Sequence, residues 1–205
     1  MKIKHILYLA SQSWSRRALL EQAKIPFEVI TQDADESQCD WNLPLPQVVK
    51  NIALYKMEHA VVPDGIKNGQ ICFVLTSDTL SQSLDGITHG KPVDKEDAIQ
   101  KLRESRNGSR LCTAFCIDKK IWQDGSWHMQ KQIVRVVKAE YTFDVPEEWI
   151  ETYFDNSIAM RCAGAIAIED FGNLFLKEVR GSYGAIVGLP LFEVRHALIE
   201  LGFFE

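Results

Sequence analysis

The stretch ASQSWSRRALL, Ala10 to Leu20, places three serines directly before two adjacent arginines. The apolar residues that follow recur at helical intervals and predict a helix over residues 16–24. The arginines therefore stand at the amino end of a helix, where unpaired backbone N–H groups already carry a partial positive charge. A capping box would place a glutamate there, so the two arginines need an explanation.

Two interpretations explain them. In the first, one serine caps the helix and the side chains of Arg16 and Arg17 are solvated. In the second, an anion binds at the helix start through the hydroxyls of Ser11 and Ser13, backbone N–H groups and the two guanidinium groups, as in phosphate sites. The second interpretation predicts a phosphate-binding loop.

Carboxylates that could act on a phosphate occur at two further places. The apolar run Ile71 to Leu75 predicts a strand buried on both faces, with Asp78 at its carboxyl edge. An aspartate there is equally typical of a turn. Asp35 and Glu36 lie in the acidic loop DADES, which by itself predicts only a solvated loop. Beside a bound phosphate, these carboxylates could hold a magnesium or manganese ion.

Two lysines could meet the same phosphate. Lys56 falls late in a helix predicted over residues 47–60, where a lone lysine is usually a surface residue. Lys91 lies in the sequence HGKP, in which Gly90 permits close approach to the backbone. His89 in the same sequence is expected at a solvated loop position rather than in catalysis.

The elements that must position these residues alternate along the chain. Strands are predicted over residues 6–10, 25–32 and 71–75 and in a hairpin of residues 111–121 and 127–143 joined at QDGS. Helices are predicted over residues 16–24 and 47–60, from a cap at Asp94, from Pro146 to Phe154, and up to Gly202 at the end of the chain. This mixture predicts an α/β fold with a twisted mixed sheet flanked by helices. We expect one domain over residues 1–205, built as two lobes with a central cleft.

The composition predicts a globular protein that binds a small molecule. Of the 205 residues, 46% are hydrophobic, enough for a substantial core. The 23 basic and 28 acidic residues leave a net charge of −5, which argues against a nucleic-acid polymer as partner because such binders usually carry a basic excess. Any phosphate site must therefore be local.

The cysteines and apolar runs favour the cytoplasm. The five cysteines show no metal-ligand spacing and are expected to be free and mostly buried. Lys2 and Lys4 precede an apolar run, but that run is shorter than a signal peptide requires. No run is long enough to cross a membrane.

Seven segments, in this order, carry a family resemblance: LYLASQSWSRRALLEQAKIPFEVI, DES, ALYKMEHA, SDT, DGITHGKPVDKEDA, CAGA and GSYGAIVGLPL. Each motif is weak alone, but the ordered set spans nearly the whole chain. It resembles the motif series of Maf-like proteins, which are nucleoside triphosphate pyrophosphatases first named for an effect on septum formation. The resemblance implies a Maf/ITPase-like fold.

The resemblance also implies hydrolysis of a nucleoside triphosphate between the α and β phosphorus atoms, with a divalent metal, magnesium or manganese. The matching positions are Ser11, Arg16, Arg17, Glu36, Lys56, Asp78 and Lys91. On this hypothesis Glu36 and Asp78 hold the metal, and Asp78 acts as the general base. Lys56, Lys91 and the arginines offset the roughly three to four negative charges of the triphosphate.

The base that this chain prefers is ambiguous in the sequence. Ser77, Cys162, Glu169, Phe171 and Gly172 resemble the branch of 7-methyl-GTP pyrophosphatases. Thr79 instead resembles the members that prefer thymidine or uridine triphosphates. We favour the methylated purine, because a carboxylate accepts hydrogen bonds from the N1–H and amino groups of guanine.

Trp14 and two tryptophans of the hairpin carry further expectations. Trp14, which stands where the family usually has proline, would either pack on the sheet or stack on the base, and a cationic base would gain most from that stacking. The resemblance makes a homodimer plausible, with exposed Trp122 and Trp127 as a candidate surface.

The sequence leaves other functions to compare with this one. A nucleotide-binding regulator of cell division that does not turn over is the main alternative. Acidic groups would weaken simple binding of a triphosphate unless a metal bridges them, so the carboxylates favour catalysis. A dinucleotide enzyme and a P-loop nucleotidase are disfavoured, because neither G-x-G-x-x-G nor G-x-x-x-x-G-K-[ST] occurs.

Overall fold

The computed structural model describes residues 5–205, so Lys2 and Lys4 lie outside the described part of the chain. The strands are β1 Ile6–Leu9, β2 Glu28–Val29, β3 Ile71–Ser83, β4 Thr88–His89, β5 Ser109–Gln123, β6 Ser126–Phe143 and β7 Leu176–Gly181. The helices are α1 Trp14–Gln22, α2 Leu45–Glu58, α3 Lys95–Ser105, α4 Ile150–Asn156, α5 Tyr183–Val187 and α6 Leu191–Glu200. Short 3₁₀ turns complete the connections.

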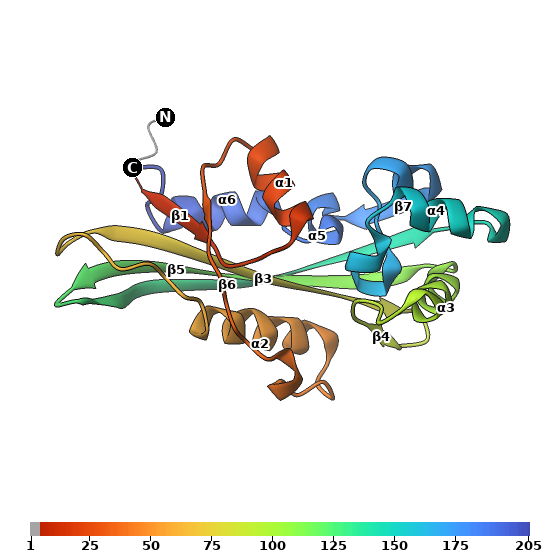
Figure 1. Cartoon of the computed structure of the whole chain (residues 1–205), viewed down its shortest axis with the longest axis horizontal. Coiled ribbons are helices and arrows are strands. Elements are labelled where there is room, and N and C mark those ends of the chain that lie inside the picture. The colour runs from red at the N-terminus through yellow and green to blue at the C-terminus, as the bar shows by residue number, and fades with distance from the viewer. Residues whose placement is uncertain (1–4) are drawn as a thin grey trace. The chain divides into compact units, whose positions relative to one another are not determined.

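The strands form one mixed sheet in the order β2-β1-β3-β5-β6-β7, with β4 paired to β3 (Figure 1). β1 runs parallel to both β2 and β3, whereas β6 and β7 are antiparallel. The predicted fold class, a mixed α/β sheet flanked by helices, is confirmed.

The strand after the second predicted helix is longer than its apolar run. Its first part is buried as predicted, but β3 continues past Leu75 through a mostly polar segment to Ser83. Thr76 Oγ1 donates to the carbonyl of Ala53 at 2.7 Å, and Ser77 Oγ donates to that of Ala114 at 2.8 Å. Because these hydroxyls are satisfied inside the protein, the polar residues stay in the strand. The prediction that Asp78 lies at a strand edge is therefore wrong.

The predicted hairpin turn and the predicted cap of α3 are confirmed, whereas one predicted strand and one predicted helix differ from the structure. The hairpin turn at Asp124 and Gly125 has φ values of 52° and 79°, as an Asp-Gly turn between β5 and β6 requires. Asp94 caps α3 by accepting from the backbone N–H of Asp97 at 2.8 Å. The predicted strand over residues 25–32 is only the two-residue β2, and the helix after Pro146 begins with a separate 3₁₀ turn.

The chain divides into two compact units. Within the described residues, the first unit consists of residues 5–78, Ala114–Val136 and Gly188–Glu205. The second consists of Thr79–Thr113 and Val137–Val187. The predicted single domain with a central cleft stays a prediction.

In the first unit, helices cover both faces of the sheet. α1 and α6 lie on one side of the strands and α2 on the other (Figure 1). The apolar stripe of α2 is buried through Val49, Ile52 and Ala53, and β1 and β3 are buried at Leu7 and Phe73. Burial on both faces explains why these two strands are nearly continuous apolar runs.

The tryptophans of the β5–β6 hairpin also pack within the first unit. The rings of Trp122 and Trp127 lie 5.2 Å apart, edge to face, and both side chains are half-buried. Trp127 Nε1 donates to the carbonyl of Pro63 at 2.8 Å, and a Cβ on Gly65 would lie 2.2 Å from Trp122 Cγ. The expectation that these tryptophans are exposed is therefore wrong.

The second unit has its own aromatic core. Tyr153 is fully buried and stacks edge-on with Phe175 and, at a tilt, with Phe143. Its hydroxyl donates to the carbonyl of Ala165 at 2.9 Å and accepts from the backbone N–H of Ala167 at 2.8 Å. These two hydrogen bonds hold the irregular segment after α4 against the core. They also take the place of the hydrogen bonds that the hydroxyl would make with water in the unfolded chain.

Replacing Gly172 with alanine should destabilise the protein by about 1 to 3 kcal/mol. A Cβ there would lie 1.7 Å from the carbonyl oxygen of Ala167, so the backbone must move to admit it. Urea unfolding of Gly172→Ala measures the loss. Gly90→Ala is the matched control, because nothing lies within 4 Å of its added Cβ. Equal stability of the two variants would contradict the prediction.

All five cysteines are free, and Cys72, Cys112 and Cys116 are buried. Burial raises the pKa of the Cys72 thiol to about 12, so this thiol is unreactive near neutral pH. Among residues 5–205, no helix has the length and apolar character needed to span a membrane.

Candidate functional site

The serine-arginine stretch forms a loop closed on itself at the start of α1. Ser13 caps the helix by accepting from the backbone N–H of Arg16, at 3.5 Å. Ser11 Oγ accepts from Arg16 Nη1 at 3.1 Å and from the backbone N–H of Ser13 at 3.3 Å. A serine cap is thus present, as the first interpretation predicts, but Arg16 is held by the protein rather than solvated.

A distant carbonyl fixes the guanidinium of Arg16. Arg16 Nε donates to the carbonyl of Gly188 at 2.9 Å, and Ser77 Oγ donates to the same carbonyl at 3.2 Å. Sequence reasoning missed Gly188. Its φ of +122° suits glycine, but no local pattern indicates that its carbonyl faces a residue 172 positions away.

The electrostatics of Arg16 link the loop to two carboxylates. Burial lowers the pKa of Arg16, and the nearby carboxylates of Asp78 and Glu36 oppose that change. The side chain stays cationic, since arginine does not lose its proton in proteins. Arg17 is half-buried, and Trp14 is 47% exposed, so the Trp14 ring can contact a ligand.

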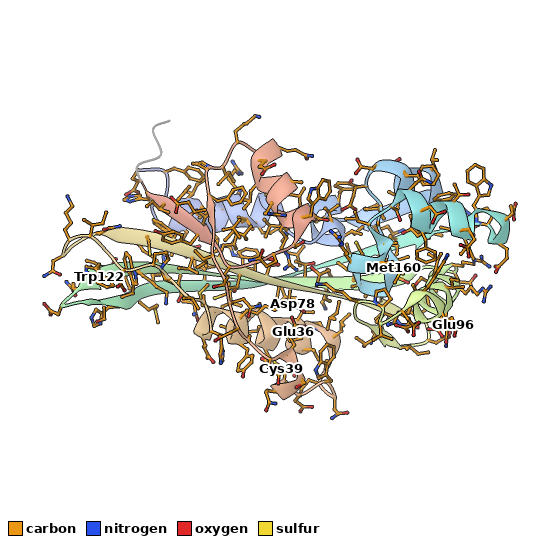
Figure 2. The ribbon with its side chains drawn as sticks, viewed as in Figure 1. Glu36, Cys39, Asp78, Glu96, Trp122 and Met160 are labelled. Atoms are coloured by element: carbon orange, nitrogen blue, oxygen red, sulfur yellow. The ribbon has the colours of Figure 1, made fainter. Side chains whose placement is uncertain are left out.

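Lys56 joins the two carboxylates directly. It lies in the last turn of α2 and is 7% exposed. Its Nζ lies 2.7 Å from Glu36 Oε1 and 2.7 Å from Asp78 Oδ1. Figure 2 labels both acidic residues, near one another beside α2. The interpretation of Lys56 as an ordinary surface lysine is wrong, because a buried ammonium needs such partners.

The two acidic residues of this loop make different contacts. Asp35 accepts from the backbone N–H of Ser37 at 3.0 Å and from its hydroxyl at 2.7 Å, and these bonds lower the pKa of Asp35. They begin the 3₁₀ turn Glu36–Gln38, so Asp35 acts as a cap. The Glu36 side chain, at the start of this turn, is 44% exposed, and its Oε1 contacts Lys56 Nζ.

Asp78 keeps one oxygen unused. Oδ1 bonds to Lys56, whereas Oδ2 is buried and has no hydrogen-bond partner among residues 5–205. A buried acceptor without a partner is costly, so it points to a water, cation or substrate group at that position.

A divalent cation fits these donors. Glu36 and Asp78 supply oxygen ligands of the kind that magnesium and manganese prefer, and Oδ2 of Asp78 is free to bind. The described residues contain no cluster of three potential ligand side chains. A cation there would therefore take its other ligands from phosphate and water, as magnesium commonly does.

Lys91, Glu169 and Thr79 belong to the second unit. Burial raises the pKa of the Cys162 thiol to about 12, with the Glu169 carboxylate acting in the same direction and Lys91 against it. Lys91 and Glu169 thus both act electrostatically on Cys162. Lys91 is exposed and Glu169 half-buried.

His89 is buried rather than solvated, contrary to expectation. It is 2% exposed, and its Nε2 lies 3.3 Å from Glu104 Oε2. Burial lowers the pKa of His89 and Lys101 lowers it further, whereas Glu104 and Asp97 raise it, with a net decrease.

This pKa shift predicts how stability depends on pH. Above about pH 6.5 His89 is neutral in both folded and unfolded chains, so its full contribution is present. Below that pH the unfolded chain binds the proton first, and stability falls until the folded pKa is reached. Urea unfolding between about pH 7.5 and 5 should show this fall reduced in His89→Gln but not in His128→Gln, which replaces an exposed histidine. An unchanged pH dependence in His89→Gln would contradict the prediction.

The mixed sheet, the two arginines at a helix start and the lysine shared by two carboxylates characterise an α/β protein with buried cations close to carboxylates. The model of the family described as Maf-like protein matches residues 6–201. The chain belongs to the Maf-like protein family.

Curated relatives match over almost their whole length. A protein of Nostoc punctiforme named nucleoside triphosphate pyrophosphatase is 32% identical over 197 residues, which cover 95% of this chain and 93% of the relative. A protein of Ruminiclostridium cellulolyticum named dTTP/UTP pyrophosphatase is 30% identical over 203 residues, 95% of both chains. One of the same name from Aromatoleum aromaticum is 32% identical over 206 residues, 96% of both chains.

Proposed function

We propose that this protein hydrolyses a nucleoside triphosphate between the α and β phosphorus atoms, which releases a nucleoside monophosphate and pyrophosphate. The chain is a nucleoside triphosphate pyrophosphatase, a hydrolase that acts on acid anhydrides. The observation that carries the proposal is the buried Lys56 held between Glu36 and Asp78. Two carboxylates around one ammonium would not serve to bind an anion alone, but they suit a site that positions water and cation at a phosphate.

Asp78 is the proposed general base. Lys56 fixes the orientation of its carboxylate through Oδ1, and Oδ2, which has two lone pairs, can accept a proton from the attacking water beside a cation. Asp78 lies within β3 rather than in a loop, so the strand holds its backbone. A fixed base loses little entropy when the water is positioned for attack.

Glu36 and Asp78 would hold the divalent cation. When bound, magnesium or manganese supplies charge stabilisation at the phosphate oxygens and helps to acidify water. The neighbouring Arg16 remains cationic and contributes charge from the loop.

The loop at α1 is the proposed phosphate-binding element. Ser11 and Arg16 hold one another, so the loop is ordered before substrate arrives. Ser13, Arg17 and the backbone N–H groups of the first turn would complete it. We propose that Lys91 also binds phosphate, as the family resemblance implies.

For the base, we propose 7-methyl-GTP as the preferred substrate, with Glu169 accepting hydrogen bonds from the guanine edge and Trp14 stacking on the cationic ring. Thr79 is the opposing signal, because it resembles the members that prefer thymidine or uridine triphosphates. Its Oγ1 lies 2.8 Å from Thr113 Oγ1. The dTTP/UTP activity named for the relatives is the competing specificity.

The test is incubation of the protein with magnesium or manganese and dTTP, UTP, GTP or 7-methyl-GTP, with pyrophosphate and orthophosphate assayed separately. Pyrophosphate release is expected, fastest from 7-methyl-GTP, and Glu169→Gln should reduce that preference. A preference for dTTP or UTP would overturn the proposed base and leave the reaction standing. Tight binding of a nucleotide without release would instead favour a non-catalytic regulator.

Two broader expectations accompany this function. We propose a cytoplasmic enzyme, consistent with five free cysteines. We also propose a homodimer, on the family resemblance. Gel filtration with light scattering checks the second, and a monomer at micromolar concentration would count against it.

A further inference from the structure

The segment that carries Lys91 has little secondary structure of its own. β4 is only two residues long, and it pairs with β3 through Ser81 opposite His89 and Gln82 opposite Thr88. Lys91 follows His89 by two positions, in a loop, with an exposed side chain. Such a short strand needs other contacts to hold it in place.

Three contacts supply them, one from each of three consecutive residues. The carbonyl of Gly90 accepts from the backbone N–H of Gly164 at 3.0 Å. The carbonyl of Lys91 accepts from Lys101 Nζ at 3.4 Å. The third contact is made by the buried ring of His89, which lies against Glu104 of α3.

The ring of His89 faces charged groups of α3. Glu104 lies nearest, 3.3 Å from Nε2, and Asp97 and Lys101 of the same helix also influence the ring. From β3, its register partner Ser81 is uncharged. The Nε2 atom makes no hydrogen bond of good geometry to residues 5–205, so a modest movement of α3 or the loop would change this contact.

We propose that His89 is a positioning residue, whose buried imidazole anchors the Thr88–Lys91 segment to α3 and so fixes Lys91 for phosphate binding. This inference rests on the proposed role of Lys91. Protonation would place a charge on a buried ring, and burial disfavours that charge more than the Glu104 carboxylate favours it, so substrate binding should weaken at acidic pH.

A double-mutant cycle separates positioning from a general loss of structure. His89→Gln should lower kcat/KM by about tenfold or more, mainly through KM, because a displaced lysine binds phosphate less well. In the Lys91→Ala background the same substitution should change kcat/KM little. His128→Gln, at an exposed histidine, should leave activity unchanged in both backgrounds.

Glu104→Gln provides a second route if His89→Gln folds poorly. It removes the carboxylate that raises the pKa of His89, so the acid side of the pH profile of kcat/KM should move to lower pH. An unmoved acid limb would overturn the proposal. So would an equal loss from His89→Gln in both backgrounds, which is what a purely structural role predicts.

Failure of the underlying assignment gives a different result. If Lys91→Ala retains full activity while the protein still releases pyrophosphate, Lys91 does not bind phosphate, and the positioning role falls with it. The reaction assigned to Asp78, Glu36 and Lys56 would stand in that case.

Discussion

Replacing Asp78 with asparagine should lower kcat by about 100- to 10,000-fold, the range expected when a general base is removed. Asparagine has the same shape and can still accept from Lys56 Nζ through Oδ1. It cannot take a proton from water, and it is a poorer ligand for a divalent cation. Lys56 would keep Glu36 as a charged partner, so the fold should survive. Initial rates of pyrophosphate release with saturating metal measure the effect.

Asp118→Asn is the matched control for this prediction. Asp118 is another buried carboxylate of the first unit, with Lys120 3.2 Å away and Gln132 Nε2 donating to it at 2.8 Å. It takes no part in the proposed reaction, so its variant should keep near-normal turnover despite some loss of stability. Full activity in Asp78→Asn, or an equal loss in both variants, would remove Asp78 from the mechanism.

Replacing Lys56 with methionine should destabilise the protein by about 3 kcal/mol, because it leaves the buried Asp78 without its nearest cation. Methionine fills a similar volume, so lost packing adds little. Glu36 contributes less to this loss, since its side chain is 44% exposed and can turn to water. Activity should also fall, because the carboxylate of Asp78 is no longer oriented. Urea unfolding at neutral pH gives the stability.

Two further variants test the cause of this loss. Lys50→Met makes the same substitution at an exposed position of α2 and should change stability by no more than about 0.5 kcal/mol. The double variant Lys56→Met and Asp78→Asn should recover part of the lost stability, since it removes the uncompensated charge as well. If Lys56→Met were as stable as Lys50→Met, the buried ion pair would have little energetic weight.

Patterns that depend on near neighbours in the chain were predictable. The apolar runs of β1 and β3, the cap at Asp94 and the Asp-Gly turn at residues 124–125 each involve groups only a few positions apart. The residues of the phosphate loop were found in the same way, because arginines at a helix start conflict with its local electrostatics. The order of motifs along the chain was enough to indicate the family.

The tertiary structure decided which polar groups are buried and what they meet. Lys56 and Asp78 are 22 positions apart, and Arg16 and the carbonyl of Gly188 are 172 apart, so no local pattern could join them. The same holds for His89, which the sequence predicts to be solvated and which is buried with its Nε2 3.3 Å from Glu104 of α3. A lysine, a histidine or a strand aspartate is stable inside a protein only when partners from other elements satisfy it, and only the folded chain brings those partners together.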